Sequence, residues 1–226
     1  MGRQLGLDLP CRTALGRDDF FVAPSNALAA ALIDDWRAWP GGKLALTGPQ
    51  GAGKTHLTHV WAAMADAKIL KAETLQSTDI AGLARCNVAV EDVPEIAGDA
   101  EAETALFHLH NLVLAEGGAL LLTGAPPVSH WGLTLPDLTS RMRGTTAAAL
   151  DAPDDTLLSA LLVKLLADRQ LTPRPDLIPY LLSRMDRSFA AAIELVAALD
   201  AASLALQRPV TRSLAALVLD KQSPRG

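Results

Sequence analysis

Short apolar runs alternate with longer helix-like stretches through the first two thirds of the chain. The runs that are bounded by glycines or polar residues are typical of buried strands: 44–47, the stretch around Ile69, 87–90, 119–123 and 145–150. Apolar residues at helical spacing predict helices before and between them: 25–40, 54–65, 75–83 and 100–115. Strands that alternate with helices in this way indicate parallel βαβ units, and therefore an α/β fold.

The strand signals disappear after Asp151. Helical stretches follow instead, at 154–169, 175–184 and 188–206, with a short last helix from Thr211. We therefore expect an extended N-terminal tail, a parallel-sheet domain and a small all-helical lid domain, at 1–17, 18–151 and 152–226.

Composition and charge limit the classes of function. The chain has 226 residues, a formal charge of -5 and a sequence pI of about 5.5, so the overall balance favours neither a nucleic-acid backbone nor an anionic membrane. Cys11 and Cys86 lie far apart in sequence, which fits a reducing cytoplasm. Polar residues interrupt the N-terminus, and we expect no apolar run of membrane-spanning length. These features predict a cytoplasmic protein without a membrane partner.

The strongest chemical signal is the segment GPQGAGKT, from Gly48 to Thr55, between a predicted strand and a predicted helix. Its glycines allow backbone N–H groups to point at phosphate oxygens, and the following helix adds the positive end of its dipole. Lys54 is expected to reach the β and γ phosphates, and Thr55 to offer its hydroxyl to Mg²⁺. The residues expected to bind ATP or ADP are Gly48, Pro49, Gln50, Gly51, Ala52, Gly53, Lys54, Thr55 and His56.

Polar residues end two later strands. Phosphate-loop proteins need an acid at the end of a neighbouring strand, to orient the metal and to polarise an attacking water. Glu91 and Asp92 stand in that position, and by chain order we assign Glu91 to Mg²⁺ and Asp92 to the water. Thr123 ends the next apolar strand, where it can sense the γ-phosphate or simply terminate the strand.

Arg141 and Arg143 follow the segment LPDLTS near the end of the predicted sheet domain. A planar guanidinium delivered across a subunit interface can stabilise transition-state charge on a partner's nucleotide. An ordinary surface charge is the alternative, and the spacing does not decide between the two.

The motifs occur in an order that resembles one family. GPQGAGKT, the acidic pair in NVAVEDV, the strand ALLLTG and the segment LPDLTSRM follow one another as in the DnaA/Hda branch of the AAA+ ATPases. The stretch 87–142, with IAGDAE at 96–101 and LPDLTSR at 135–141, resembles the Hda group in particular, and the similarity extends through nearly the whole chain. The resemblance implies a parallel-sheet P-loop AAA+ domain of the α/β class, followed by a small all-helical lid domain.

The same resemblance implies partners and a role. QLGLDLP is similar to the short motif by which that group docks onto the β sliding clamp of DNA polymerase, so the implied contacts are Gln4, Leu5, Leu7, Leu9 and Pro10. Members of the group, on a DNA-loaded clamp, promote hydrolysis of the ATP held by the initiator DnaA, and the family's arginine finger falls on Arg141, acting in trans. We expect no room for a helix-turn-helix domain after the lid, so DNA would be reached only through these partners. Self-association into a homo-oligomer stays open.

Two departures from the family pattern lower the expected intrinsic ATPase. Ala190 stands where the family has a nucleotide-sensing arginine, and Glu91 stands where many relatives have Asp. Arg184 and Arg187 are nearby but differ in helical phase. We therefore expect weak or absent intrinsic hydrolysis, with stimulation of the partner's. Three alternatives remain: a helicase-loader-like ATPase adaptor, a P-loop kinase of a small molecule, and a clamp adaptor that does not affect hydrolysis.

Overall fold

The computed structural model describes Val22 and residues 24–222. The expected tail contacts Gln4, Leu5, Leu7, Leu9 and Pro10 lie outside the described residues.

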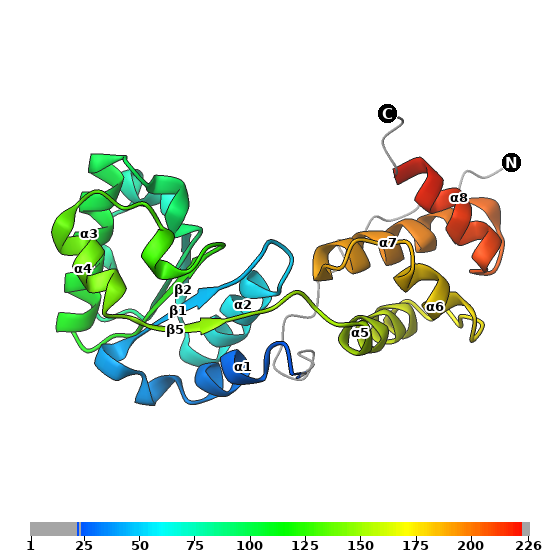
Figure 1. Cartoon of the computed structure of the whole chain (residues 1–226), viewed down its shortest axis with the longest axis horizontal. Helices are drawn as coiled ribbons and strands as arrows, with labels where there is room; N and C mark the ends of the chain where they lie inside the picture. Colours follow the sequence, from blue (N-terminus) through cyan, green and yellow to red (C-terminus); the bar gives the residue numbers. More distant parts are fainter. Residues whose placement is uncertain (1–21, 23, 223–226) are drawn as a thin grey trace, which may run out of the picture.

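A five-stranded parallel sheet forms the centre of the first region of the chain (Figure 1). The strands are short and apolar, as expected for strands covered on both faces: β1 (Lys43–Thr47), β2 (Lys68–Lys71), β3 (Val88–Glu91), β4 (Leu120–Gly124) and β5 (Thr146–Ala149). Their order in the sheet is β2-β3-β4-β1-β5. β1 is therefore the strand between two neighbours that are both later in sequence, and loops after such a strand lie at a topological switch point.

Helices cover both faces of the sheet. α1 (Ala27–Asp34) and α2 (Lys54–Ala65) share one apolar core with Leu44 and Leu46. α3 (Ala100–Ala115) and α4 (Pro136–Arg143) share a second core with Ala45, the residue between those two. The period of two along β1 thus divides its side chains between the two layers of helices. We call this part of the chain, residues 27–149, the sheet region.

The helices expected from the sequence differ from those of the structure in three places. The expected helix 75–83 is instead a pair of 3₁₀ turns, Ala72–Ser77 and Ala81–Leu83. The hydroxyls of Ser77 and Thr78 both donate to the carbonyl of Thr74, and such local bonds compete with helical ones.

The other two differences concern the ends of the sheet region. α1 stops at Asp34 and is followed by the 3₁₀ turns Trp36–Ala38 and Pro40–Gly42, where a single helix to residue 40 was predicted. α4 was not predicted as a helix at all, although Pro136 occupies its first position, which is a recognised helix start.

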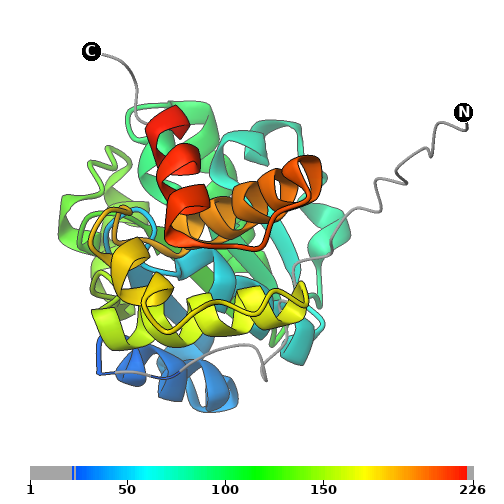
Figure 2. The same cartoon turned by 90° about the vertical axis from the view of Figure 1, so that its right-hand side faces the viewer.

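The remaining helices form a separate bundle, which we call the helical region, residues 155–222. Its members are α5 (Asp155–Asp168), α6 (Leu177–Leu182), α7 (Phe189–Leu206) and α8 (Arg212–Gln222). They bury an apolar core of their own, made largely of leucines such as Leu162, Leu195 and Leu214. Figure 2 shows α7 between α5 and α8, in agreement with the packing of both helices against it.

α7 corrects one expectation from the sequence. It has 18 residues and a mean hydropathy of 1.8, so by length and composition alone it could cross a membrane, whereas we predicted no apolar run that long. Its residues Ala192, Leu195, Val196 and Leu199 are buried in the core of the helical region. This packing accounts for part of the apolar composition of the helix, since 22% of the apolar stretch is buried and Leu204 and Leu206 are exposed.

Candidate functional site

The candidate site lies at the carboxyl edge of the sheet, where β1, β3 and β4 end together. Leu46 of β1 pairs with Thr123 of β4, and Val90 of β3 pairs with Leu122. Glu91 is therefore level with Thr123 and with Leu46, which lies two residues before the loop that follows β1. Parallel strands thus bring the phosphate-loop segment, the acidic pair and Thr123 to one edge, as their order along the chain predicts.

The loop from Gly48 to Gly53 has the backbone conformation that its glycines permit. Gly48, Gly51 and Gly53 have φ angles of 145°, 78° and 98°, in a range that side chains with a Cβ rarely adopt. A Cβ on Gly48 would lie 2.2 Å from the carbonyl oxygen of Leu150, so the close approach of the loop to the chain after β5 requires glycine. Pro49 and Gln50 are exposed at the tip, and Ala52 is buried.

Lys54 is the first residue of α2 and lies folded against the loop. Its Nζ donates hydrogen bonds to the carbonyl oxygens of Gly48 and Pro49, at 2.7 and 2.9 Å. Burial lowers the pKa of Lys54, while the charges of Asp92 and Glu91 act in the opposite direction. The cation is therefore close to both acids and within the curve of the loop, next to the exposed Thr55.

Glu91 fits a metal site. The residue is buried, and its Oε1 has no hydrogen-bond partner among the described residues. A buried carboxylate oxygen without a partner costs free energy unless water or a cation completes it. Carboxylate and hydroxyl oxygens are the ligands that Mg²⁺ prefers, together with substrate phosphates. Glu91 and Thr55 therefore carry oxygens of the kind that Mg²⁺ prefers.

Asp92 and Thr123 are joined directly. The backbone N–H of Asp92 donates to Oγ1 of Thr123 at 3.1 Å. Asp92 has a φ of 58°, an uncommon conformation for a non-glycine residue, and its side chain is exposed while Thr123 is buried. Thr123 thus holds the turn that presents the Asp92 carboxylate at the edge of the site.

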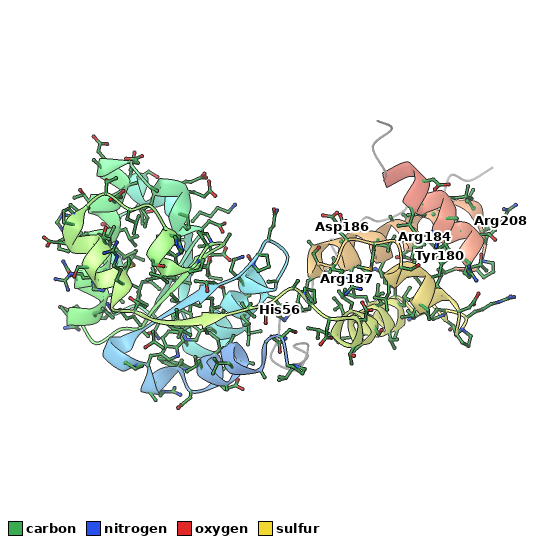
Figure 3. All side chains as sticks on the ribbon, viewed as in Figure 1. His56, Tyr180, Arg184, Asp186, Arg187 and Arg208 are labelled. Carbon is green, nitrogen blue, oxygen red and sulfur yellow. The ribbon has the colours of Figure 1, made fainter. Side chains whose placement is uncertain are left out.

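The start of α7 packs against the phosphate loop. The N–H of Phe189 donates to the carbonyl oxygen of Gly51 at 3.2 Å, and a Cβ on Gly51 would lie 2.2 Å from Cβ of Ser188. Ala190, the next residue, is exposed. In Figure 3, His56 lies on the side of the sheet region that faces the helical region. The loop is therefore a point of contact between the two regions.

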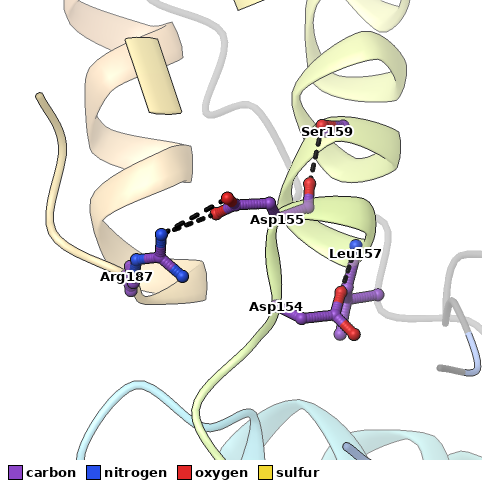
Figure 4. Close-up of polar contacts among 5 residues, drawn as sticks. All are labelled: Asp154, Asp155, Leu157, Ser159 and Arg187. Atoms are coloured by element: carbon purple, nitrogen blue, oxygen red, sulfur yellow. Dashed lines mark hydrogen bonds and ion pairs between the residues drawn. The ribbon is translucent and has the colours of Figure 1, made fainter. Parts of the chain in front are cut away.

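The arginines before α7 are engaged within the helical region. Arg187 forms an ion pair with Asp155 at 3.0 Å, beside Asp154, which caps the start of α5 (Figure 4). Arg184 lies over the ring of Tyr180, at 4.3 Å from its centroid. These partners explain why neither arginine is directed to the loop in this structure.

Arg141 lies at the opposite edge of the sheet. Its carbonyl oxygen accepts a hydrogen bond from Nζ of Lys43, the first residue of β1, at 2.9 Å. The phosphate loop follows the last residue of that strand, and a strand of 5 residues spans roughly 15 Å. The exposed side chain of Arg141 therefore projects far from the chain's own loop.

Sequence reasoning missed the residues that hold α4. Glu103 is fully buried and accepts hydrogen bonds from the N–H groups of Gly98, Thr134 and Leu135. Its signal was present, because an acid that falls on the apolar stripe of a helix needs buried donors.

A comparison with models of known protein families finds no match. Solved structures do resemble the chain. Domain III of the Thermotoga maritima replication initiation protein DnaA is 18% identical, with a TM-score of 0.77 over 92% of this chain and 96% of that one. The AMPPCP-bound DnaA of Aquifex aeolicus is 18% identical, with a TM-score of 0.66 over 78% of this chain and 62% of that one.

A second kind of protein shares the same architecture. A variant of Thermotoga maritima RuvB is 18% identical, with a TM-score of 0.63 over 87% of this chain and 66% of that one. At these identities the likeness concerns the fold. The chain has the α/β fold of a P-loop AAA+ domain, with a parallel sheet followed by a helical bundle.

Proposed function

We propose that this chain is a nucleotide-bound AAA+ regulator of chromosome replication initiation. In this proposal, residues 18–151 bind ATP or ADP with Mg²⁺, residues 152–226 act as the lid, and the tail binds the β sliding clamp. Arg141 acts in trans as an arginine finger on the ATP held by the initiator DnaA. The observation that carries the proposal is the exposed position of Arg141 at the sheet edge opposite the chain's own loop.

The geometry of the loop supports nucleotide binding. The positive φ angles of Gly48, Gly51 and Gly53 bend the loop ahead of α2, a conformation that lets backbone amides and the helix dipole attract phosphate oxygens. The structurally similar Aquifex DnaA is bound to AMPPCP, which supports an adenine nucleotide as the ligand. His56, on the first turn of α2, borders the same site.

Each residue of the site has one task in this proposal. The loop amides bind the phosphates, and Lys54 exchanges its bonds to Gly48 and Pro49 for bonds to the β and γ phosphates. Thr55 and Glu91 would hold Mg²⁺, which when bound neutralises charge on the phosphate oxygens. Asp92, presented by Thr123, positions and polarises the attacking water.

Intrinsic hydrolysis is proposed to be slow. The exposed Ala190 leaves no guanidinium at the start of α7, and the two preceding arginines are engaged with Asp155 and Tyr180. Transition-state charge on the γ-phosphoryl group is therefore less completely balanced than in a site with an arginine from the lid. A bound nucleotide would serve mainly to fix the start of α7 against the loop.

The proposal is tested by the hydrolysis of DnaA-bound ATP in the presence of clamp, DNA and this protein. Arg141→Ala should lower the stimulated rate about a thousandfold, because one guanidinium at the transition state contributes on that order. Arg143→Ala, on the same helix and also exposed, is the matched control and should stimulate like the unaltered chain. Equal stimulation by both variants would reject the arginine finger.

The alternatives make different predictions in simple assays. A P-loop kinase would transfer phosphate to a small-molecule acceptor, a helicase loader would retain the replicative helicase in a pull-down, and a clamp adaptor without effect on hydrolysis would tolerate Arg141→Ala. Our proposal predicts retention of the clamp and of DnaA, without phosphotransfer.

A further inference from the structure

α3 carries three unusual residues on the face that meets α4. Glu103, Phe107 and His110 recur at spacings of four and three, which places them in one stripe along the helix. Two of the three, Glu103 and His110, are polar yet buried, at 0% and 2% exposure. Polar residues in an apolar interface are costly to bury, so their partners indicate what the stripe does.

Glu103 fixes the start of α4. Its carboxylate accepts two bonds from the N–H of Thr134, at 3.0 and 2.9 Å, and one from the N–H of Leu135 at 2.6 Å. The hydroxyl of Thr134 and the N–H of Gly98 complete the set, at 3.1 and 2.8 Å. Leu135 is the residue immediately before α4. A single buried carboxylate thus binds the turn from which α4 begins.

Lys43 and Thr145 fix the other end of the helix. Nζ of Lys43 and Oγ1 of Thr145 both donate to the carbonyl oxygen of Arg141, each at 2.9 Å. The Nζ of Lys43 also lies 3.2 Å from Nε2 of His110, the last residue of the stripe. α4 is therefore held at both ends through α3 and β1.

Between these two anchors, the guanidinium of Arg141 lies over the ring of Phe107. Its Cζ is 5.2 Å from the centroid of the ring, within the range of a cation–π contact. Arg141 is exposed and Phe107 is only half-buried, so the guanidinium packs over the ring at the surface. A long, exposed arginine without such a contact would sample many rotamers.

We propose that Phe107 is a positioning residue for Arg141, on a helix whose register Glu103 fixes, so that the guanidinium is presented to a partner's nucleotide in one orientation. This inference rests on the proposed function of Arg141. A group that must meet a transition state gains from being held in place before the encounter, because a displacement of about 1 Å can cost on the order of a hundredfold in rate.

Phe107→Leu and Phe107→Tyr, made in the full chain, form the test. Leucine keeps the apolar bulk but removes the ring, so the maximal stimulated rate of DnaA-bound ATP hydrolysis should fall about 2- to 5-fold, the loss expected for a cation–π contact at an exposed site. The concentration that gives half-maximal stimulation should stay unchanged, and the melting temperature should fall only slightly, because the ring is half-buried against the core. Phe107→Tyr keeps the ring and should restore the rate.

A second measurement separates this inference from the proposed function. The Nε–H resonance of Arg141, assigned through its loss in Arg141→Ala, should lose its ring-current shift in Phe107→Leu and keep it in Phe107→Tyr. If Arg141→Ala abolishes stimulation while Phe107→Leu stimulates fully, the positioning inference is wrong and the proposed function stands. If Arg141→Ala stimulates fully, the proposed function is wrong. An unchanged resonance in Phe107→Leu would then also reject the contact between Phe107 and Arg141.

Discussion

At the scale of single residues, the conformation of the phosphate loop depends on glycines whose replacement would cause a steric clash. Gly48 and Gly41 both have positive φ angles, 145° and 63°, but they differ in their surroundings. A Cβ on Gly48 would meet the backbone of Leu150 at 2.2 Å, whereas a Cβ on Gly41 would meet nothing within 4 Å. The requirement for glycine at the first loop position was predictable from the motif, but the partner that imposes it was not, because Leu150 is a hundred residues away in sequence.

The pair Gly48→Ala and Gly41→Ala separates crowding from backbone preference. Gly41→Ala should lower the free energy of unfolding by about 1 kcal/mol, the cost of a left-handed conformation. Gly48→Ala should cost about 3 kcal/mol or more, because the backbone carbonyl of Leu150 must also move. Urea unfolding of both variants measures the difference, and equal losses would contradict the contact.

At the scale of elements, the strands and the long helices followed the hydrophobic pattern, and α4 did not. β1, α2 and α3 begin and end within a residue of their predicted ends, since glycines lie near most of those ends and the apolar positions are regular. α4 buries only two apolar residues, Leu138 and Met142. Two positions are too few for a helical pattern to be detected in the sequence. Its anchors on α3 are long-range contacts, which no local pattern contains.

The buried His110 makes the stability of the folded chain depend on pH. Burial, followed by the positive charge of Lys43, lowers the pKa of His110 from 6.5 to about 4, although its bond to Asn111 acts in the opposite direction; the charge of Arg141 lowers it further. The unfolded chain therefore binds a proton below pH 6.5 that the folded chain refuses until about pH 4. The free energy of unfolding is therefore not reduced by His110 above pH 6.5, and it decreases as the pH falls from 6.5 toward 4.

His110→Gln removes that titration and provides the comparison. Between about pH 7.5 and about pH 5, the unaltered chain should lose about 2 kcal/mol more of its unfolding free energy than the variant does. Parallel losses in the two proteins would mean that His110 titrates normally in the fold. Urea unfolding at the two pH values decides between these outcomes.

At the scale of the whole molecule, the sheet region and the helical region meet at the phosphate loop, through Gly51 and the start of α7. The division into a sheet and a helical bundle was predictable, because the alternation of strands and helices stops after Asp151. The contact itself was not, since it joins Gly51 to Ser188 and Phe189 through space. A nucleotide in the loop would touch both regions and stabilise them together.

We expect this coupling to appear as a thermal shift. ADP with Mg²⁺ at a hundred times its dissociation constant should stabilise the folded chain by about 2.7 kcal/mol. Lys54→Ala should abolish most of this shift, because charged hydrogen bonds to phosphate contribute about 1.5 to 3 kcal/mol each. Differential scanning calorimetry of both proteins provides the measurement, and an equal shift in the variant would place the nucleotide elsewhere.

The tail can be tested separately from the nucleotide site. Gln4→Ala combined with Leu7→Ala should abolish binding to the sliding clamp, because these residues carry the resemblance to the docking motif. The thermal shift with ADP should be unchanged, since neither residue belongs to the phosphate-loop segment. Clamp binding that persists in the double variant, measured by surface plasmon resonance, would move the docking site to another part of the chain.

The fold of Lys54 onto the loop has a consequence for how a nucleotide would enter. The side chain of Lys54 is already buried, and its ammonium group already donates to the carbonyls of Gly48 and Pro49. An incoming phosphate would therefore compete with those carbonyls instead of with bulk water, and the association step would include a local rearrangement of the lysine. Entry would then be slower than simple electrostatic capture, and less sensitive to ionic strength than the charge on the ligand suggests.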